Sequence, residues 1–224
     1  MNRSDRLIVA LDVPDLAEAA LLLARLRPLV RWFKVGSELF TAAGPRAVAL
    51  VLESGGRVFL DMKYHDIPQT VGRAVASAGR LGVSMVNVHA AGGEAMLRAA
   101  AGARGAGVLL IGVTVLTSLQ DDPLTVADQA RRVQEAGLDG VVASAREAAL
   151  IKQACGDRFL VVTPGIRPAD APEDDQRRTA TPGEAVAAGS DFLVVGRPIT
   201  AARDPAQAAE RILDEMRDAV AGRV

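Results

Sequence analysis

Residues 59–68 read FLDMKYHDIP, so a run that begins as a buried strand ends in a cluster of charge. Side chains alternate between the two faces of an extended segment, and we therefore expect Asp61 and Lys63 to point the same way. Charged groups at the end of an apolar strand are costly unless they are paired or used. We consequently expect this segment to carry the chemistry of the protein.

Seven further runs resemble the strand that leads into this segment. Each is short and nearly continuously apolar, which is typical of strands buried on both faces, as in a parallel sheet covered by helices. The eight expected strands span residues 7–13, 32–36, 58–63, 85–89, 108–116, 140–144, 159–163 and 192–196.

The segments between these runs carry helix signals. Asp15 with Glu18, and Thr181 with Glu184, match the capping-box pattern of a helix start. Eight alternations of strand and helix in 224 residues predict an α/β fold, a single (β/α)8 TIM barrel in which residues 1–224 form one catalytic domain. A doubly wound open sheet is the alternative, but no Gly-x-Gly-x-x-Gly follows the first strand.

Composition limits the partners and the compartment. A net charge of −1 argues against binding to nucleic acid. We expect no membrane partner, because no apolar run approaches membrane-spanning length and the first residues resemble neither a signal peptide nor an anchor. Cys155 is the only cysteine, which excludes an internal disulfide and favours the cytoplasm. No His or carboxylate pattern surrounds Cys155, so we interpret it as a packing residue.

Reactive side chains of a TIM barrel lie at the carboxyl ends of its strands. Asp12 ends the first strand, and four further charges form a cluster of alternating sign: Lys34 on the second strand, Asp61 and Lys63 on the third, and Asp66 just after it. A structural ion-pair network would be the simpler interpretation of one pair, but four charges at the rim favour catalysis. Lys63 is then a cationic acid between carboxylates and Asp61 repels an anionic substrate group, an arrangement suited to protonating a carbanion.

Two other strand ends predict a phosphate site. Barrels often bind phosphate through the loops after strands 7 and 8, where Arg167 and the pair Gly196-Arg197 lie. Gly196 lets a backbone N–H approach an anion, and each arginine offers a forked cation. One such pair would more simply end a strand, whereas two on adjacent strands favour phosphate. Residues 165–180 are the candidate for a mobile substrate loop.

The two histidines and the tryptophan are given structural or peripheral roles. His65 lies between the charged positions, and His89 ends the fourth strand, where it could line a pocket. Their spacing does not match a zinc site. Trp32 begins a strand and is most simply a core residue.

At this point the chain resembles the orotidine 5′-phosphate decarboxylase family over nearly its whole length. The motifs occur in the family's order, and together they are far more specific than any one of them. They are Ala10-Leu11-Asp12, Phe33-Lys34-Val35-Gly36, Asp61-Met62-Lys63-Tyr64-His65-Asp66-Ile67-Pro68 with Thr70, Val115-Leu116-Thr117-Ser118, Thr163-Pro164-Gly165-Ile166-Arg167-Pro168, Asp175-Gln176 and Val195-Gly196-Arg197-Pro198-Ile199.

The resemblance implies the same barrel fold and a cofactor-free, metal-free reaction. Orotidine 5′-monophosphate (OMP) would lose CO2 to give uridine 5′-monophosphate (UMP), as in pyrimidine biosynthesis. Lys63 would protonate C6 of the pyrimidine, Asp61 would press against the leaving carboxylate, and Asp66 would complete the charge network.

The resemblance also assigns the binding residues and the oligomer. Asp12 and Lys34 would hold the ribose hydroxyls, and Thr117 would contact the pyrimidine. The phosphate side would be bound by Arg167, Gln176, Gly196 and Arg197. Residues that match Asp66, Ile67 and Thr70 reach into the other subunit's site in this family, which implies a homodimer with shared active sites.

Two alternatives remain. Hexulose-phosphate synthases and ketogulonate-phosphate decarboxylases carry a similar Asp-x-Lys-x-x-Asp motif but resemble Mg²⁺ enzymes with an acidic residue near the position of Lys34. A cation at that position opposes binding of a divalent metal. A non-catalytic barrel that binds a phosphorylated ligand is the other alternative, but it would not need Lys63 between two carboxylates.

Overall fold

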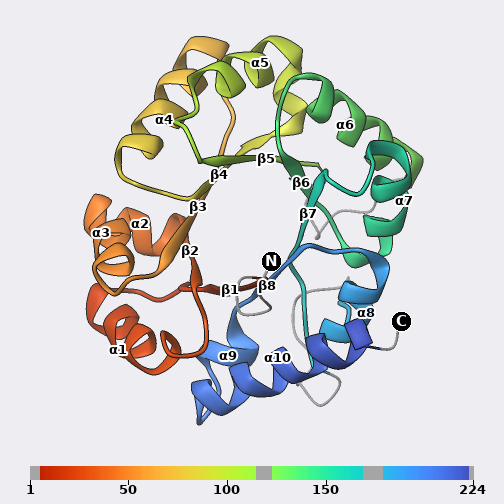
Figure 1. The fold of residues 1–224 in the computed structure, drawn as a ribbon. Helices are drawn as coiled ribbons and strands as arrows, with labels where there is room; N and C mark the ends of the chain where they lie inside the picture. The colour runs from red at the N-terminus through yellow and green to blue at the C-terminus, as the bar shows by residue number, and fades with distance from the viewer. Residues whose placement is uncertain (1–5, 115–122, 169–178, 222–224) are drawn as a thin grey trace.

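The computed structural model describes residues 6–114, 123–168 and 179–221. Eight parallel strands follow one another around a closed barrel, and the pairing of the last strand with the first completes it. Figure 1 looks along the barrel axis and shows the helices as an outer ring. The strands are β1 (Leu7–Ala10), β2 (Trp32–Gly36), β3 (Arg57–Tyr64), β4 (Met85–His89), β5 (Leu109–Val113), β6 (Gly140–Val142), β7 (Leu160–Thr163) and β8 (Phe192–Val195). The predicted (β/α)8 barrel is therefore confirmed.

The predicted strand bounds agree best in the first half of the chain. Strands β2 and β4 have the predicted bounds, whereas β1 ends at Ala10 rather than at residue 13. It ends early because the chain turns towards Asp15, which caps the first helix. Strand β6 ends at Val142 because Ser144 is already the N-cap residue of the next helix. The predicted end of β5, residues 115 and 116, lies outside the described residues.

Helices follow the strands and cover the outside of the barrel. In the predicted caps, the Asp15 carboxylate accepts the Glu18 N–H at 2.9 Å, and Thr181 and Glu184 form a reciprocal capping box. The helices are α1 (Leu16–Leu26), α2 (Ser37–Ala43), α3 (Pro45–Glu53), α4 (Pro68–Arg80), α5 (Gly93–Ala103), α6 (Pro123–Glu135), α7 (Ala145–Cys155), α8 (Pro182–Ala188), α9 (Arg197–Thr200) and α10 (Pro205–Ala221), with a short 3-10 helix at Ala90–Gly92.

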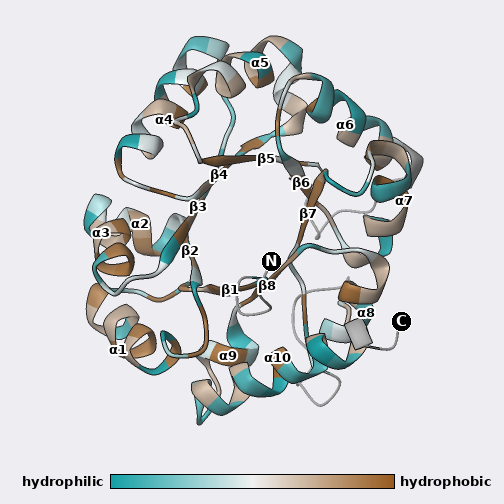
Figure 2. Ribbon diagram, in the orientation of Figure 1, coloured by the Kyte–Doolittle hydropathy of each residue, from teal (hydrophilic) through white to brown (hydrophobic). Residues whose placement is uncertain are grey.

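The barrel has two cores because successive strand residues point to opposite faces. Ile8, Trp32, Phe59 and Phe192 belong to the inner cluster, which fills the barrel. Residues of the other strand face, such as Phe33, pack against the helices in the outer cluster. In Figure 2 the strands are largely apolar, whereas the helices carry both polar and apolar residues. The prediction that Trp32 is a core residue is confirmed, since it is 2% exposed.

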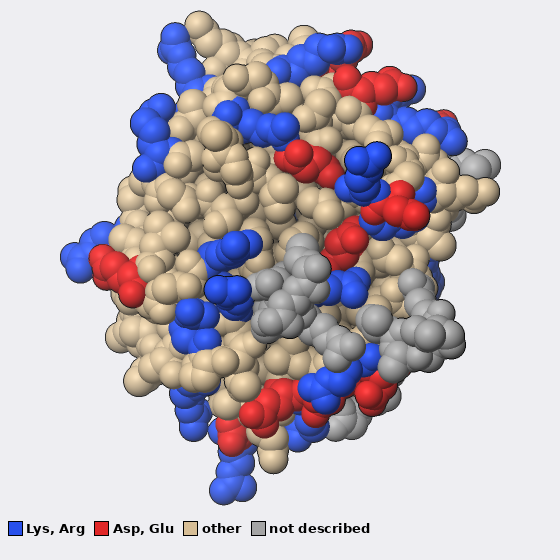
Figure 3. Space-filling model, viewed as in Figure 1, with Lys and Arg blue, Asp and Glu red and all other residues tan. Residues whose placement is uncertain are grey.

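The outer surface mixes charges of both signs. On the face shown in Figure 3, basic and acidic groups are interspersed and separated by uncharged surface. Among the described residues, Leu21 and Ile67 are the large apolar side chains with the greatest exposure, at 70% and 65%. Within the same part of the chain, no helix combines the length and the apolar character needed to cross a membrane.

An ion pair anchors β7, β8 and α7 at the amino ends of the strands. The Lys152 ammonium donates to the Asp191 carboxylate at 2.7 Å and to the carbonyls of Asp157 and Phe159 at 2.8 Å. The same carboxylate oxygen of Asp191 accepts the Val161 N–H at 2.8 Å. The Lys152 side chain is only 13% exposed, so its ammonium relies on these acceptors rather than on water for its hydrogen bonds.

We expect Asp191→Ala to destabilise the fold by about 2–3 kcal/mol, because it leaves the Val161 N–H without its acceptor and removes the carboxylate paired with a largely buried ammonium. Urea denaturation measures the change. The matched control is Arg98→Ala, which breaks an exposed pair with Glu94 and should cost no more than about 0.5 kcal/mol. Equal effects of the two substitutions would contradict the anchoring role of Asp191.

Candidate active site

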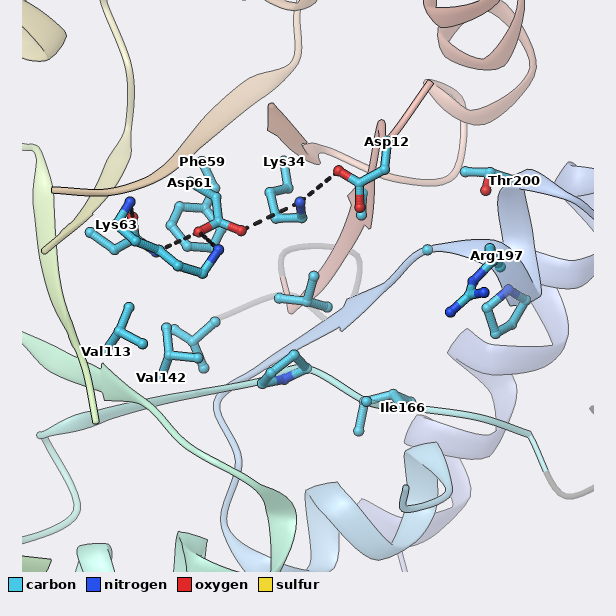
Figure 4. Close-up of a pocket in the computed structure, with 18 of the residues that line it drawn as sticks. Asp12, Lys34, Phe59, Asp61, Lys63, Val113, Val142, Ile166, Arg197 and Thr200 are labelled. Carbon is cyan, nitrogen blue, oxygen red and sulfur yellow. Dashed lines mark hydrogen bonds and ion pairs between the residues drawn. The ribbon is translucent and has the colours of Figure 1, made fainter. Parts of the chain in front are cut away.

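A pocket of about 460 Å³ opens at the carboxyl ends of the strands. Its volume lies in the range of roughly 300–1,000 Å³ that is usual for small-molecule sites. Every strand contributes a residue to its lining. In chain order these are Ala10, Lys34, Phe59, Asn87, Val113, Val142, Val162 and Val194. Four of these residues are valines, and in the view of Figure 4 Val113 and Val142 lie below the charged groups.

Four charged side chains alternate in sign along one side of this pocket. The Lys34 ammonium lies 2.8 Å from an Asp12 oxygen and 3.4 Å from an Asp61 oxygen. The other Asp61 oxygen accepts from the Lys63 ammonium at 2.7 Å. The dashed lines in Figure 4 follow this charge chain from Asp12 to Lys63. The two central members, Lys34 and Asp61, are nearly buried, whereas Asp12 and Lys63 are more exposed.

The barrel register produces the first pair of the charge chain. Strand β1 pairs with β2 so that Ala10 lies opposite Lys34, which brings Asp12, just beyond the end of β1, to the ammonium. Gly36 keeps this space open. A Cβ at that position would lie 2.8 Å from the Lys34 ammonium nitrogen and 2.9 Å from an Asp12 carboxylate oxygen.

Pairing keeps both central groups charged. Burial by itself would raise the pKa of Asp61, but the charges of Lys34 and Lys63, with hydrogen bonds from Lys63 and Asn87, outweigh burial and lower this pKa. Burial would likewise lower the pKa of Lys34, but Asp61 and Asp12 together raise it above the ordinary value. Asp61 is therefore an anion and Lys34 a cation at neutral pH.

Lys63 does not continue the regular strand that the sequence suggested. Its backbone is left-handed, with φ of 49°, and the register between β3 and β4 shifts between Leu60 and Tyr64. Asp61 and Lys63 do meet, as predicted, but simple alternation along a strand is the wrong reason. The irregular backbone and the long lysine side chain bring them together.

Asn87 is a site residue that the sequence analysis missed. It lies on β4, is 1% exposed and contacts both Asp61 and the backbone of Lys63. Its signal was a polar residue inside an apolar strand, two positions after Met85, a member of the inner core cluster. Glu38 and Thr200 also line the pocket and were likewise missed.

Asp66 does not join the charge chain of its own subunit. Its carboxylate accepts the Ile67 N–H at 2.6 Å, and Asp66, Ile67 and Thr70 are all exposed and not part of the pocket lining. The expected group of Lys34, Asp61, Lys63 and Asp66 is therefore corrected within one chain, because Asp12 takes the fourth place. That Asp66 serves the active site of another subunit stays a prediction.

The predicted phosphate residues line the opposite end of the same pocket. Arg167, Gly196 and Arg197 all belong to its lining. Figure 4 shows Arg197 and Ile166 well separated from Lys63, across the pocket. The backbone N–H of Arg167 donates to the Ala180 carbonyl at 2.9 Å, which fixes the main chain at this position. Thr117 and Gln176 lie outside the described residues, as does most of the predicted loop at 165–180.

The two histidines lie beside the pocket rather than in it. The rings of His65 and His89 are 5.3 Å apart, and neither residue is part of the pocket lining. Burial lowers the pKa of His89, and the neighbouring His65 and Lys63 add to this effect. In the described part of the chain, no cluster of three or more His, Cys, Asp or Glu side chains could hold a metal ion.

Comparison with known proteins gives a consistent result. The family model described as "Orotidine 5'-phosphate decarboxylase / HUMPS family" matches residues 5–212. The orotidine 5′-phosphate decarboxylase of Moorella thermoacetica is 54% identical over 96% of this chain and 94% of its own length, and that of Syntrophotalea carbinolica is 53% identical over 94% of each. The crystal structure of the Lactobacillus acidophilus enzyme has a TM-score of 0.82 and 37% identity, covering 95% of this chain and 99% of its own. This chain therefore belongs to the orotidine 5′-phosphate decarboxylase / HUMPS family.

Proposed function

We propose that this protein decarboxylates OMP to UMP and CO2 in pyrimidine biosynthesis, without a cofactor or metal. The named activity of its relatives supports this proposal. The observation that carries it is the charge chain Asp12–Lys34–Asp61–Lys63 on one side of a pocket whose far side presents Arg167 and Arg197. Such a pocket can hold a phosphate at one end and act on a carboxylate at the other.

Lys63 is the proposed proton donor. When the bond between C6 and the carboxylate breaks, the electron pair stays on C6, and no pyridoxal-type electron sink is invoked to delocalise it. A preorganised cation can stabilise this charge and then transfer a proton to C6. The Lys63 ammonium, held 2.7 Å from Asp61, meets both requirements. The neutral amine regains its proton from water after the product forms.

Asp61 is proposed to act on the ground state. Its carboxylate stays ionised because Lys34 and Lys63 lower its pKa against the effect of burial. A substrate carboxylate forced close to it is repelled, and this repulsion disappears as CO2 leaves. Contacts made far from C6 would supply the binding energy that holds the two anions together.

The remaining predicted residues bind the rest of the substrate in this proposal. Asp12 and Lys34 hold the ribose hydroxyls, and Thr117 contacts the pyrimidine. Arginine forks suit phosphate oxygens, so Arg167 and Arg197, with Gly196 and Gln176, bind the phosphate. We also propose that residues 1–224 act as a single catalytic domain in the cytoplasm.

We further propose a homodimer in which Asp66, Ile67 and Thr70 complete the partner's active site. Two facts support this arrangement. Asp66 lies outside its own charge chain, and Ile67 exposes 65% of an apolar side chain. Burying such a side chain against a partner would be favourable, by about 1.5–3 kcal/mol for a full side chain.

Magnesium-dependent chemistry is disfavoured by the position of Lys34. Its ammonium lies between Asp12 and Asp61, the two carboxylates that a divalent ion would need at this edge. A metal ion there would have to displace a buried, paired cation.

We therefore expect the purified protein to convert OMP at a rate that excess EDTA does not change. The loss of the carboxylate alters the absorbance of the pyrimidine, which provides a continuous assay. Folded protein that produces no absorbance change would overturn the proposed function. Activity that EDTA abolishes and Mg²⁺ restores would instead support a metal-dependent member of the family.

A further inference from the structure

Asn87 connects the two groups on which the proposed chemistry depends. Its side-chain oxygen accepts the backbone N–H of Lys63 at 2.8 Å, and its side-chain nitrogen donates to the Asp61 carboxylate at 2.7 Å. The opposite orientation of the amide would place NH2 against N–H and oxygen against carboxylate. Both contacts therefore fix the amide in one orientation.

The contact with the Lys63 backbone holds an unfavourable conformation. A lysine in the left-handed region is less stable than in the right-handed or extended regions by roughly 1–2 kcal/mol. Lys63 has φ of 49°, and it is the only residue other than glycine with positive φ in the described chain. The N–H that Asn87 accepts belongs to this residue, so the contact acts directly on the strained position.

The contact with Asp61 fixes the other partner. One Asp61 oxygen accepts from both Lys63 and Asn87 at 2.7 Å, and the second oxygen faces Lys34 at 3.4 Å. Asn87 is neutral, so it orients the carboxylate without adding charge. It is 1% exposed, so water does not compete for its hydrogen bonds. Such a buried, satisfied contact favours one geometry.

We propose that Asn87 is a positioning residue that sets the Lys63 ammonium and the Asp61 carboxylate in their reactive geometry through one side-chain amide. This inference rests on the proposed decarboxylation. It gives β4 a role in a reaction whose charged groups come from β2, from β3 and from Asp12 just beyond β1.

The first test is Asn87→Ala, assayed with OMP at saturating and limiting concentrations. We expect kcat to fall on the order of 100-fold, as for misplacement of a reacting group by about 1 Å. KM should stay within about threefold, because the lost contacts act on the reacting groups rather than on the phosphate end. A crystal structure of the variant should show Lys63 outside the left-handed region. This structural readout does not depend on any substrate.

Asn87→Asp is the conservative variant that separates positioning from simple packing. It keeps the acceptor for the Lys63 N–H but places a second carboxyl group beside Asp61, so that one of the two carboxyls must titrate at a raised pKa. When protonated, the new group can donate to Asp61 again. Its activity should rise as the pH falls from about 8 to 5, by up to about tenfold per pH unit, relative to Asn87→Ala.

Other groups around Asp61 must be considered in this pH dependence. Lys34 of β2, Lys63 of β3 and His89 of β4 all interact with Asp61, and Asp12 acts through Lys34. His89 is the imidazole among them, and burial lowers its pKa from the ordinary value, so it is the group to replace in a control. The rise should therefore persist when Asn87→Asp is combined with His89→Gln.

Ser190→Ala is the control for loss of a buried hydrogen bond away from the pocket. Ser190 is fully buried and pairs with Thr163 at 2.7 Å, so this variant should lose stability but keep the wild-type kcat and pH profile.

Wild-type protein without OMP turnover would refute the proposed function. Active wild type with Asn87→Ala within about threefold of its kcat, or with Lys63 still left-handed, would refute the role of Asn87 alone. If Asn87→Ala does not fold, a flat profile of Asn87→Asp refutes it.

Discussion

Replacing Lys63 with alanine is expected to remove nearly all turnover and leave the barrel folded. The variant loses the proposed proton donor and the cation nearest the developing charge, so kcat/KM should fall about 10⁴-fold or more. That loss corresponds to about 5.5 kcal/mol of transition-state stabilisation. Asp61 keeps its contacts with Lys34 and Asn87, so the charge that remains is still paired. Steady-state assays with OMP and a thermal unfolding curve measure the two effects.

Lys63→Gly provides a matched control, because glycine suits the left-handed backbone at this position. We expect this variant to be as inactive as Lys63→Ala and more stable than it by about 1 kcal/mol. An increase in stability with a complete loss of activity would show that Lys63 serves the reaction rather than the fold. Substantial decarboxylation by either variant would contradict the role of Lys63 as proton donor.

The barrel could be predicted because each strand carries its own signal. Strands buried on both faces must be apolar throughout, so each of the eight runs marks its strand independently of its neighbours. The same reasoning fails at strand ends, because polar groups and helix caps, rather than the apolar run, determine where a strand stops. This explains why β1 and β6 end earlier than their apolar runs.

The detailed site could not be predicted in the same way, because it depends on departures from regular structure. Alternation along β3 holds only while the strand is regular, and the register shift before Tyr64 ends that regularity. No local pattern shows that Lys63 is left-handed. Nor does a local pattern show that Asn87, 24 positions further on, holds it there.

The composition of the charge chain depends on neighbouring strands rather than on neighbouring residues. Asp66 is close to Lys63 in sequence, yet Asp12 joins the chain because β1 pairs with β2 beside Lys34. A sequence interpretation that groups charges by proximity along the chain favours Asp66. The barrel register favours Asp12. If the chain forms the proposed dimer, both interpretations hold, with Asp66 supplied by the partner.

Mixing two inactive variants should restore activity if Asp66 acts in the partner's site. We expect Lys63→Ala and Asp66→Ala to be inactive separately. When equal amounts are unfolded together and refolded, about half of the dimers contain one subunit of each kind. In such a dimer, one site lacks both groups, and the other combines an intact Lys63 with an intact Asp66. Total activity should therefore approach about one quarter of the wild-type value.

The restored activity should depend on subunit exchange. A mixture of the two native variants should stay inactive when it is assayed before subunits have had time to exchange. Sedimentation should show a dimer in every sample. The physical basis is that Asp66 and Ile67 are exposed and lie outside the pocket lining of their own chain. If Asp66 acted within its own subunit, every site of the mixed dimer would lack either Lys63 or Asp66. A refolded mixture without activity, or a protein that sediments as a monomer while it turns over OMP, would contradict the shared site.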